Sequence, residues 1–376
     1  MLSRKTQMNI SLAAKESQYD SAATLDELIN VNIGSIPQEN VQVINDQDLT
    51  GGKEEATDQE VFAQSVSLDV GINRVKPTPL LWVGAYGLGA AAAAAADSGT
   101  AATKVRQYAC TPVDNDGSTN SFTFEFWFDT SLKYKYTGGM INSFSLSVQQ
   151  GANRFVSLNT NIIASGTRAA AGSAQTEHAE TQLNAASAGA YLLIDATDPP
   201  DADIADAFTA DISTAANRSQ TLAPGTSNLA ASDGTVHDIA SRLRSATWDF
   251  SNNISPDDNY RIGGGKVLSD NNRGGRTQTL TLELDHVDDD FTVLLKNQYT
   301  CAFQMIVQGA EVETGYYEGF DLIFPRMKLQ SVQVTDSGGN LVDRLVYQIL
   351  EDSGATYKSV YFDVFADSTG RTAIMA

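Results

Sequence analysis

The sequence is poor in the side chains that bind metals and attack substrates. Among 376 residues there are three histidines and two cysteines. His178, His237 and His286 lie far apart, and none belongs to an HExxH motif, so we expect two loop histidines (178 and 237) and one on a sheet face. Cys110 and Cys301 fall in expected strands, where a buried free thiol is the expected state. We therefore predict no catalytic, cofactor-binding or metal-binding residue and no cofactor.

Positive charge is also scarce. Lysine and arginine number 25 against 46 aspartates and glutamates, which gives a formal net charge of −21. Phosphate binding requires clustered lysine and arginine, so a general nucleic-acid-binding face is excluded. The sequence contains no run of about 18 apolar residues that would span a membrane. Residues 1–5 lack the apolar segment of a secretory signal, so we expect assembly in a cytoplasm.

Two local patterns resemble ligand sites only superficially. Residues 263–266 read GGGK, but a P-loop needs GxxxxGK[ST], and Val267 stands where serine or threonine is required. An acidic stretch offers oxygen ligands to Ca²⁺ without the glycine spacing of an EF-hand loop. Its aspartates are Asp198, Asp201, Asp203 and Asp206. We interpret it as a solvated loop, and calcium binding there stays open. With no GxSxG elbow either, we predict that the chain is not an enzyme.

What the sequence does contain is strand-like alternation. Apolar and polar side chains that alternate indicate a strand with one buried face. The clearest segment places four aromatic side chains on one face: Phe122, Phe124, Phe126 and Phe128. The other face of the same segment carries Thr123, Glu125, Trp127 and Asp129. A second segment alternates Phe62, Val66, Leu68 and Val70 with small polar residues. The fold class that follows is mainly β.

The order of these elements occurs twice. Strand 62–70, helix 77–90, strand 105–110 and hairpin 121–149 match strand 279–286, helix 288–296, strand 300–308 and hairpin 318–334. We predict two tandem β-sandwich units, each with a flanking short helix. The alternative is one large β-sandwich whose strands only look alike.

The predicted organisation has four parts. Residues 1–60 form an N-terminal arm, 61–165 the first unit, 166–240 an Ala- and Asp-rich connection or insertion, and 241–376 the second unit. Arms of this kind often stay mobile until a neighbouring subunit receives them. Within these parts we expect a short helical turn at 26–29, and a helix end or a loop at 90–96. Pro325 is expected to mark a kink or an edge position in a strand.

Several short motifs follow one another in a familiar order. They are AKESQY at 14–19, TGGM at 137–140, SG at 165–166, TWDFSNNI at 247–254, and FP at 324–325 followed by Gln330, Asp336 and a Gly–Gly turn at 338–339. In this order they resemble the tail tube proteins of long-tailed bacteriophages. The likeness covers most of residues 10–30 and 60–366 except 166–240. The alanine run and the acidic connection depart from the family's pattern.

The resemblance implies a structural subunit of a tail tube. Sheets of neighbouring subunits would join into a β-barrel-lined ring, and rings would stack into a conduit for double-stranded DNA. Partners would be copies of the same chain and other tail proteins at the tube ends, in a virion and with no membrane. Two units per chain favour a trimeric ring with pseudo-sixfold symmetry, and one unit would need a hexamer. We favour a non-contractile tail, and hypothesise that part of the −21 charge faces the channel, where it would repel DNA.

A second class of protein remains open. Acidic chains of two sandwiches with calcium-binding loops are typical of surface adhesion or S-layer-like modules, which a calcium-dependent melting temperature would favour. A hydrolase on a β-sandwich would need two or three converging acids, and the sequence nominates no such set.

Overall fold

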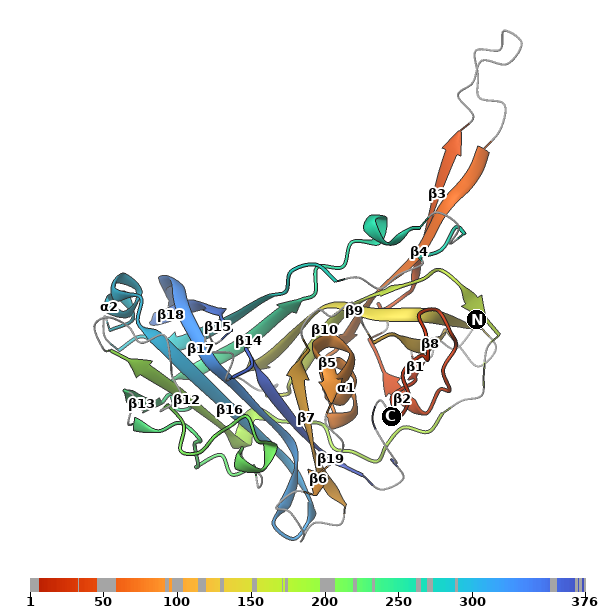
Figure 1. Ribbon diagram of the computed structural model, residues 1–376. Coiled ribbons are helices and arrows are strands. Elements are labelled where there is room, and N and C mark those ends of the chain that lie inside the picture. The colour runs from red at the N-terminus through yellow and green to blue at the C-terminus, as the bar shows by residue number, and fades with distance from the viewer. Residues whose placement is uncertain are drawn as a thin grey trace.

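The structure, a computed structural model, describes most of the chain (Figure 1). The described residues are 7–32, 34–45, 59–91, 95–96, 104–113, 120–128, 132–150, 154–170, 172, 175–196, 207–218, 222–231, 234–261, 265–268, 273–287, 290–351, 357–368, 371 and 374. Within them the fold is mainly β, and the strands form one large antiparallel sheet that is not closed into a barrel. The helices of this part are too short or too polar to cross a membrane.

Eight strands form a broad antiparallel array, which we call the wall. Its order is β3 (Gln38–Asn45), β4 (Gln59–Ile72), β10 (Ser157–Ala164), β9 (Lys133–Gln149), β14 (Leu243–Ser251), β15 (Thr277–Asp285), β18 (Asn340–Ile349) and β17 (Tyr316–Ser337). Leu280, Leu282 and Leu284 of β15 are fully buried, and the residues between them are partly exposed. The wall therefore has one face in the core and one open face, as the alternation predicts.

The other strands extend from the N-terminal halves of β9 and β17. On β17 these are β16 (Thr300–Glu313), β12 (Ala188–Asp195) and β13 (Thr235–Asp238) at one edge, and β19 (Tyr361–Asp367), β7 (Val105–Pro112), β5 (Gly89–Ala91) and β6 (Ala95–Ala96) at the other. On β9 they are β8 (Phe122–Trp127), β1 (Gln7–Ile10) and β2 (Glu27–Asn30) at one edge, and β11 (Arg168–Ala169) at the other. The two longest strands therefore tie the wall to the rest of the sheet.

The predicted short helices are present beside these strands. Helix α1 (Pro77–Val83), which has proline at its first position, is wholly buried and continues into a π-helical turn, η1 (Gly84–Leu88). Helix α2 (Asp290–Asn297) follows β15. 3₁₀ turns that lie wholly within the described residues include η2 (Ala185–Ser187), η4 (Ala215–Asn217) and η6 (Pro256–Asn259).

One hydrophobic core spans both halves of the chain. Trp248 of β14 makes edge-on contacts with Phe144 of β9, Phe324 of β17 and Phe362 of β19, with ring centroids 4.8, 5.5 and 5.6 Å apart. Because these strands come from both predicted units, the units share one core as well as one sheet.

The order of pairing is nevertheless the same in the two halves. The first half contributes the quartet β3–β4–β10–β9, and the second the quartet β14–β15–β18–β17. Direct pairing of β9 with β14 joins the quartets and places Ser145 opposite Asp249. The quartets do not coincide with the elements matched in the sequence. Residues 318–334, expected as a hairpin, lie within the single strand β17, and the strand on β9 that corresponds to β16 on β17 is β8 rather than β7.

Pro325 lies where β17 changes neighbours. Residues 319–323 of β17 pair with β19, whereas residues 327–337 pair with β18. The ladder to β16 also shifts register at this point, between Cys301 and Phe303. A residue without an N–H is tolerated where ladder bonds are interrupted, so Pro325 occupies the break between two partners.

Two predictions of local structure are wrong. Residues 26–29, expected as a helical turn, include β2, which pairs with β1. Residues 90–96, expected as a helix end or a loop, supply β5 and β6, which both pair with β7, while 92–94 lie outside the described residues. In each case pairing with a distant strand overrides the local propensity.

Two faces are buried differently from the expectation. Phe62 lies on the face of β4 that is buried further along, but it is 52% exposed because β3 and β4 project from the body as a hairpin there (Figure 1). The polar face of β8 is buried as well, because the segment between β1 and β2 covers it: Thr123 donates to Glu16 and accepts from the N–H of Ala23, and the N–H of Gly172 donates to Glu125. The predicted arm therefore supplies β1 and β2 to the sheet, with a covering segment between them.

The described part of the predicted connection covers the outer side of β16, β17 and β19. Phe208, Ile212 and Leu229 pack with Ile323 and Tyr361 in a second, smaller cluster. Within this segment, residues 188–195 form strand β12. Strands β16, β17 and β19 are consequently buried on both faces over much of their length.

Candidate assembly surfaces

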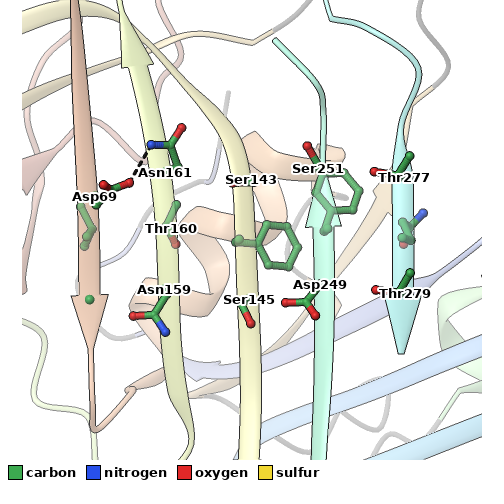
Figure 2. Close-up of a pocket in the computed structure, with 15 residues that line it drawn as sticks. Asp69, Ser143, Ser145, Asn159, Thr160, Asn161, Asp249, Ser251, Thr277 and Thr279 are labelled. Atoms are coloured by element: carbon green, nitrogen blue, oxygen red, sulfur yellow. Dashed lines mark hydrogen bonds between the residues drawn. The ribbon is translucent and has the colours of Figure 1, made fainter. Parts of the chain in front are cut away.

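The open face of the wall is lined by short polar side chains (Figure 2). From β4 to β15 they are Asp69, Asn159, Asn161, Ser143, Ser145, Asp249, Ser251, Thr277 and Thr279. Asn161 donates to Asp69 at 2.7 Å, and the hydroxyls of Ser147 and Thr247 lie 2.8 Å apart across the junction of β9 and β14. Hydroxyl and amide groups dominate, so this face is hydrophilic with little charge at its centre.

Charged side chains of both signs lie further along the same face. Glu283 accepts a hydrogen bond from Ser245 at 3.0 Å, and Arg244 pairs with Asp285 at 2.6 Å. Arg244, Ser245, Glu283 and Arg344 line one shallow depression on this face. The described residues therefore show an open face of mixed charge, with carboxylates at several points.

The first three motifs of the sequence converge on one buried cluster. Glu16, 5% exposed, accepts hydrogen bonds from Thr123 and Ser121 at 2.7 Å and from the N–H of Gly138 at 3.0 Å. Burial raises the pKa of Glu16, although these hydrogen bonds oppose the rise. The AKESQY segment is thus held against the TGGM turn by a carboxylate that it supplies.

Asp20 extends this cluster to the third motif. Its carboxylate accepts from the hydroxyls of Thr137 and Ser165 at 2.5 Å and of Thr167 at 2.9 Å. Asp20 itself has a left-handed backbone, with φ of +65°. The segment 14–20 therefore closes over the ends of β9 and β10 through specific polar contacts.

Gly138 is required at the centre of the cluster. Its φ is +66°, and a Cβ atom there would lie 2.9 Å from the Cζ atom of Tyr19 and 3.0 Å from the Cβ of Ser165. Both the backbone conformation and the packing thus exclude a side chain at this position.

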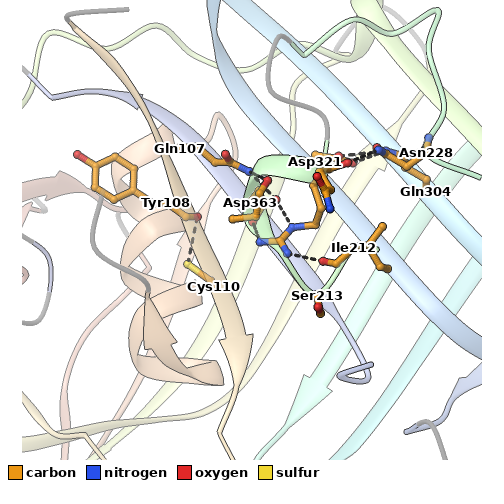
Figure 3. Close-up of polar contacts among 12 residues, drawn as sticks. Gln107, Tyr108, Cys110, Ile212, Ser213, Asn228, Gln304, Asp321 and Asp363 are labelled. Atoms are coloured by element: carbon orange, nitrogen blue, oxygen red, sulfur yellow. Dashed lines mark hydrogen bonds and ion pairs between the residues drawn. The ribbon is translucent and has the colours of Figure 1, made fainter. Parts of the chain in front are cut away.

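A buried arginine joins the covering segment 207–218 to strand β19, through contacts that Figure 3 shows. Arg218 donates to both carboxylate oxygens of Asp363 at 2.5 and 2.9 Å and to the carbonyl of Ile212 at 2.6 Å. Gln107 donates to the same carboxylate at 2.9 Å. Burial alone would lower the pKa of Arg218, but the charge of Asp363 raises it overall. This two-point contact therefore holds residues 212–218 on β19.

A second buried acid lies beside this pair. Asp321 is opposite Asp363 on neighbouring strands, and Gln304 donates to both of its oxygens at 3.0 Å. Gln304 in turn accepts from the N–H of Asn228 at 2.7 Å. The polar positions of β16, β17 and β19 thus bind the backbone and side chains that cover them.

A third charged cluster joins the two ends of the chain. Arg371 donates to Glu27 at 3.1 Å and to Glu180 at 3.3 Å, and its guanidinium also reaches the hydroxyl of Thr78 at 2.6 Å. His178 contacts Glu27 at 3.4 Å. Burial alone would raise the pKa of Glu27, but the hydrogen bond from His178 and the charge of Arg371 lower it overall. The hydrogen bond to Glu27 in turn raises the pKa of His178.

Glu318 lies at the rim of that cluster. Its carboxylate accepts the N–H of Thr181 at 2.9 Å and is near Glu180. Burial raises the pKa of Glu318 to about 7, the hydrogen bond from Thr181 opposes the rise, and the charge of Glu180 adds to it. This acid therefore titrates near neutral pH.

The projecting hairpin of β3 and β4 presents apolar side chains to solvent. Val41, Val43, Ile44 and Phe62 are 51 to 56% exposed. Val334 and Leu341, at the opposite edge of the wall, are 48 and 53% exposed. Apolar side chains gathered on a protruding hairpin indicate a contact surface.

The histidines and cysteines differ in how far they match expectation. Cys110 and Cys301 are buried free thiols, as predicted. His286 contacts Asp343 at 2.8 Å beside the sheet. His178 is not solvated, since its side chain is 17% exposed and pairs with Glu27, and His237 lies in β13 rather than in a loop. Local sequence patterns could not reveal these charged partners, because Glu27 and Asp343 are distant along the chain from the histidines that they contact.

The superficial ligand patterns gain no support from the described residues. The acidic stretch 198–206 and residues 263–264 lie outside them, and Lys266 contacts Glu60 at 3.4 Å. Among the residues the structure describes, no group of three or more His, Cys, Asp or Glu side chains is placed to hold a metal ion.

Comparison with known proteins identifies one family. A family model described as phage tail tube protein matches residues 7–339, which include the three converging motifs and every strand of the two quartets except β18. No curated protein matches the chain.

Proposed function

The chain belongs to the phage tail tube protein family, and from that premise we propose that its copies form rings which stack into a hollow conduit for double-stranded DNA. The family is structural rather than enzymatic.

The open polar face of the wall carries this proposal. A wide sheet with one face in the core and the other lined by Ser, Thr and Asn side chains is suited to enclosing an aqueous channel. Duplex DNA carries about one negative charge per 1.7 Å of axis, so a basic face would retain it. Asp69 and Asp249 instead place carboxylates among the neutral groups, and they would favour passage over binding.

The repeated quartets support a ring of three chains. If each chain supplies two equivalent quartets, three chains complete a pseudo-sixfold ring, whereas a single unit per chain would require six. The same pairing order in β3–β4–β10–β9 and β14–β15–β18–β17 favours the first arrangement. Each quartet is then one tube unit with a flanking helix, α1 or α2.

The projecting hairpin suits contact between stacked rings. It extends beyond the body of the chain (Figure 1) and exposes Ile44 and Phe62 at 56 and 52%. Burying about 100 Å² of such apolar surface contributes about 2.5 kcal/mol before losses of side-chain entropy. We propose that the tube is part of a non-contractile virion tail that is assembled in the host cytoplasm. Other tail proteins would bind at the two ends of the tube.

Cysteine accessibility tests which face lines the channel. Ser145 replaced by cysteine should react with a polyethylene-glycol maleimide in the unassembled chain and resist it in assembled tubes, while a small maleimide still reacts. Ser213, exposed on the covering segment, serves as the outer control after the same replacement. Rapid labelling of S145C by the bulky reagent in intact tubes would contradict the assignment.

A further inference from the structure

The two ends of the wall are counterparts of two strands that already pair inside the chain. We propose that the C-terminal half of β17 in one copy pairs antiparallel with β3 of the next copy, in the manner in which β9 pairs with β14 within a single chain. This inference rests on the proposed ring assembly and adds which strands join and in which register.

The repeat of pairing order defines the counterparts. In the quartets β3–β4–β10–β9 and β14–β15–β18–β17, strands β3 and β14 are first and strands β9 and β17 are last. Inside the chain the last strand of the first quartet takes the first strand of the second. The same rule applied at the outer ends joins β17 to the next copy's β3.

The free edge of β17 begins at the equivalent place. On β9, the ladder with β8 ends at Gly139 and the ladder with β14 starts at Ser143 on that same edge. On β17, the ladder with β16 ends at Lys328. Beyond it, residues 331–337 pair with β18 on one edge, and the described part of the chain offers no strand to the other edge. β3 likewise pairs only with β4 among these residues.

The side chains at the two free edges are suited to joining. Exposed edge strands are usually blunted by lysine, proline or charge, because unpaired N–H and C=O groups recruit other strands. Residues 38–45 and 330–337 contain no lysine, arginine or proline and one acid each, Glu39 and Asp336; the first proline is Pro37, directly before β3. Val41 and Val334 are about half exposed on these strands, at 51 and 48%. A second copy would satisfy the backbone groups and cover the valines.

Superposing the quartets gives the register. The buried Leu68 of β4 superposes on the buried Leu280 of β15, which also makes the last residues of β10 and β18, Ala164 and Ile349, equivalent. Under this superposition Gly71 matches Glu283, and Ser67 matches Thr279.

Two short chains of ladder partners then fix one intermolecular pair. In the first quartet Gly71 pairs with Asn159, which pairs with Ser145. In the second quartet Glu283 pairs with Arg344, which pairs with Gln333. Because Gly71 matches Glu283, Gln333 is the counterpart of Ser145. Thr279 pairs with Asp249, and Ser67 pairs with Gln38. Because Ser67 matches Thr279, Gln38 is the counterpart of Asp249. Because Ser145 lies opposite Asp249, Gln333 should lie opposite Gln38 of the next copy.

A disulfide between these positions tests the junction. Directly opposite residues in an antiparallel pair have Cα atoms about 4.5 to 5.5 Å apart, within disulfide range. We expect Q333C/Q38C to form an intermolecular disulfide on mild oxidation of assembled tubes, and the covalent ladder to end at the number of chains in one ring. Both residues are exposed, and Cys110 and Cys301 are buried, so background oxidation is low.

Matched variants give each outcome a meaning. Q333C/Q42C shifts the partner by four residues, about 13 Å, and should not cross-link. The single variants Q333C and Q38C should stay monomeric on non-reducing gels. Efficient cross-linking of Q333C/N40C or Q333C/Q42C instead would keep the strand pairing and overturn the register.

Failure of the junction is distinguishable from failure of the assembly. Tubes that form normally yet cross-link at none of the three pairs would overturn this inference and leave the tube function intact. A wild-type chain that forms neither rings nor tubes with its assembly partners would contradict the proposed function itself.

Discussion

Replacing Arg218 with alanine should destabilise the chain strongly, because the Asp363 carboxylate would stay buried without its counter-ion. The two side chains are 2 and 1% exposed and meet at 2.5 Å. Removing one partner of a buried ion pair typically costs about 3–5 kcal/mol. Asp321, on the neighbouring strand, adds a second buried carboxylate that the guanidinium charge helps to stabilise.

The expected shift in melting temperature follows from the length of the chain. With an unfolding entropy of about 2.1 cal/mol/K per residue, the melting temperature of a chain of 376 residues falls by about 1.3 °C for each kcal/mol of stability lost. R218A should therefore melt about 4–6 °C lower than wild type. Scanning calorimetry should use the unassembled chain, because association shifts apparent stability.

A matched control removes an exposed charge. Lys266 and Glu60 form an ion pair at 3.4 Å, and their side chains are 47 and 76% exposed. Because exposed pairs contribute about 0–1 kcal/mol, K266A should shift the melting temperature by about 1 °C or less. An R218A variant that melts like K266A would refute the reasoning, since the Asp363 carboxylate would then tolerate burial without Arg218.

Three further predictions concern other clusters. The folded-state pKa of Glu318, about 7, lies above the usual value of 4.5, so its contribution to stability is present below about pH 4.5 and is lost as pH rises through 7. Urea unfolding at pH 5 and pH 8 should therefore show a smaller loss of unfolding free energy for E318Q than for wild type. Equal losses in the two proteins would contradict this prediction. I44S/F62S should keep the melting temperature of the unassembled chain but shorten or abolish tubes in electron micrographs, whereas tubes of normal length would exclude the hairpin from ring stacking. G138A should lower thermal stability more than G338A, because both glycines have positive φ but only Gly138 is crowded; equal melting temperatures would show that packing adds nothing there.

The sequence predicts best where one face alone meets the core. The leucines of β15 and the acid-led helix α2 follow from periodicity and end signals, and the structure has both. The Gly–Gly turn between β17 and β18 is also confirmed, since Gly338 and Gly339 have φ of +67 and +89°. These features depend on neighbours in sequence, so local patterns reveal them.

Features that depend on distant partners escape the sequence. Asp321 and Asp363 occupy the polar positions of alternating strands, which predicts solvent exposure, yet both are 1% exposed under the covering segment. Glu16 meets Gly138 across 122 positions of the chain, so nothing local shows that its carboxylate is buried. The motifs marked both regions as similar to one family, while only the fold shows the contacts that join them.

Electron cryomicroscopy of the assembled tube would show which face of the wall lines the channel. We expect a hollow tube whose rings hold three chains, with the face of Ser145, Asp249 and Thr279 turned to the axis and β17 against β3 between chains. A tube with that face on its outer surface, or with the helices α1 and α2 lining the channel, would rule out this arrangement.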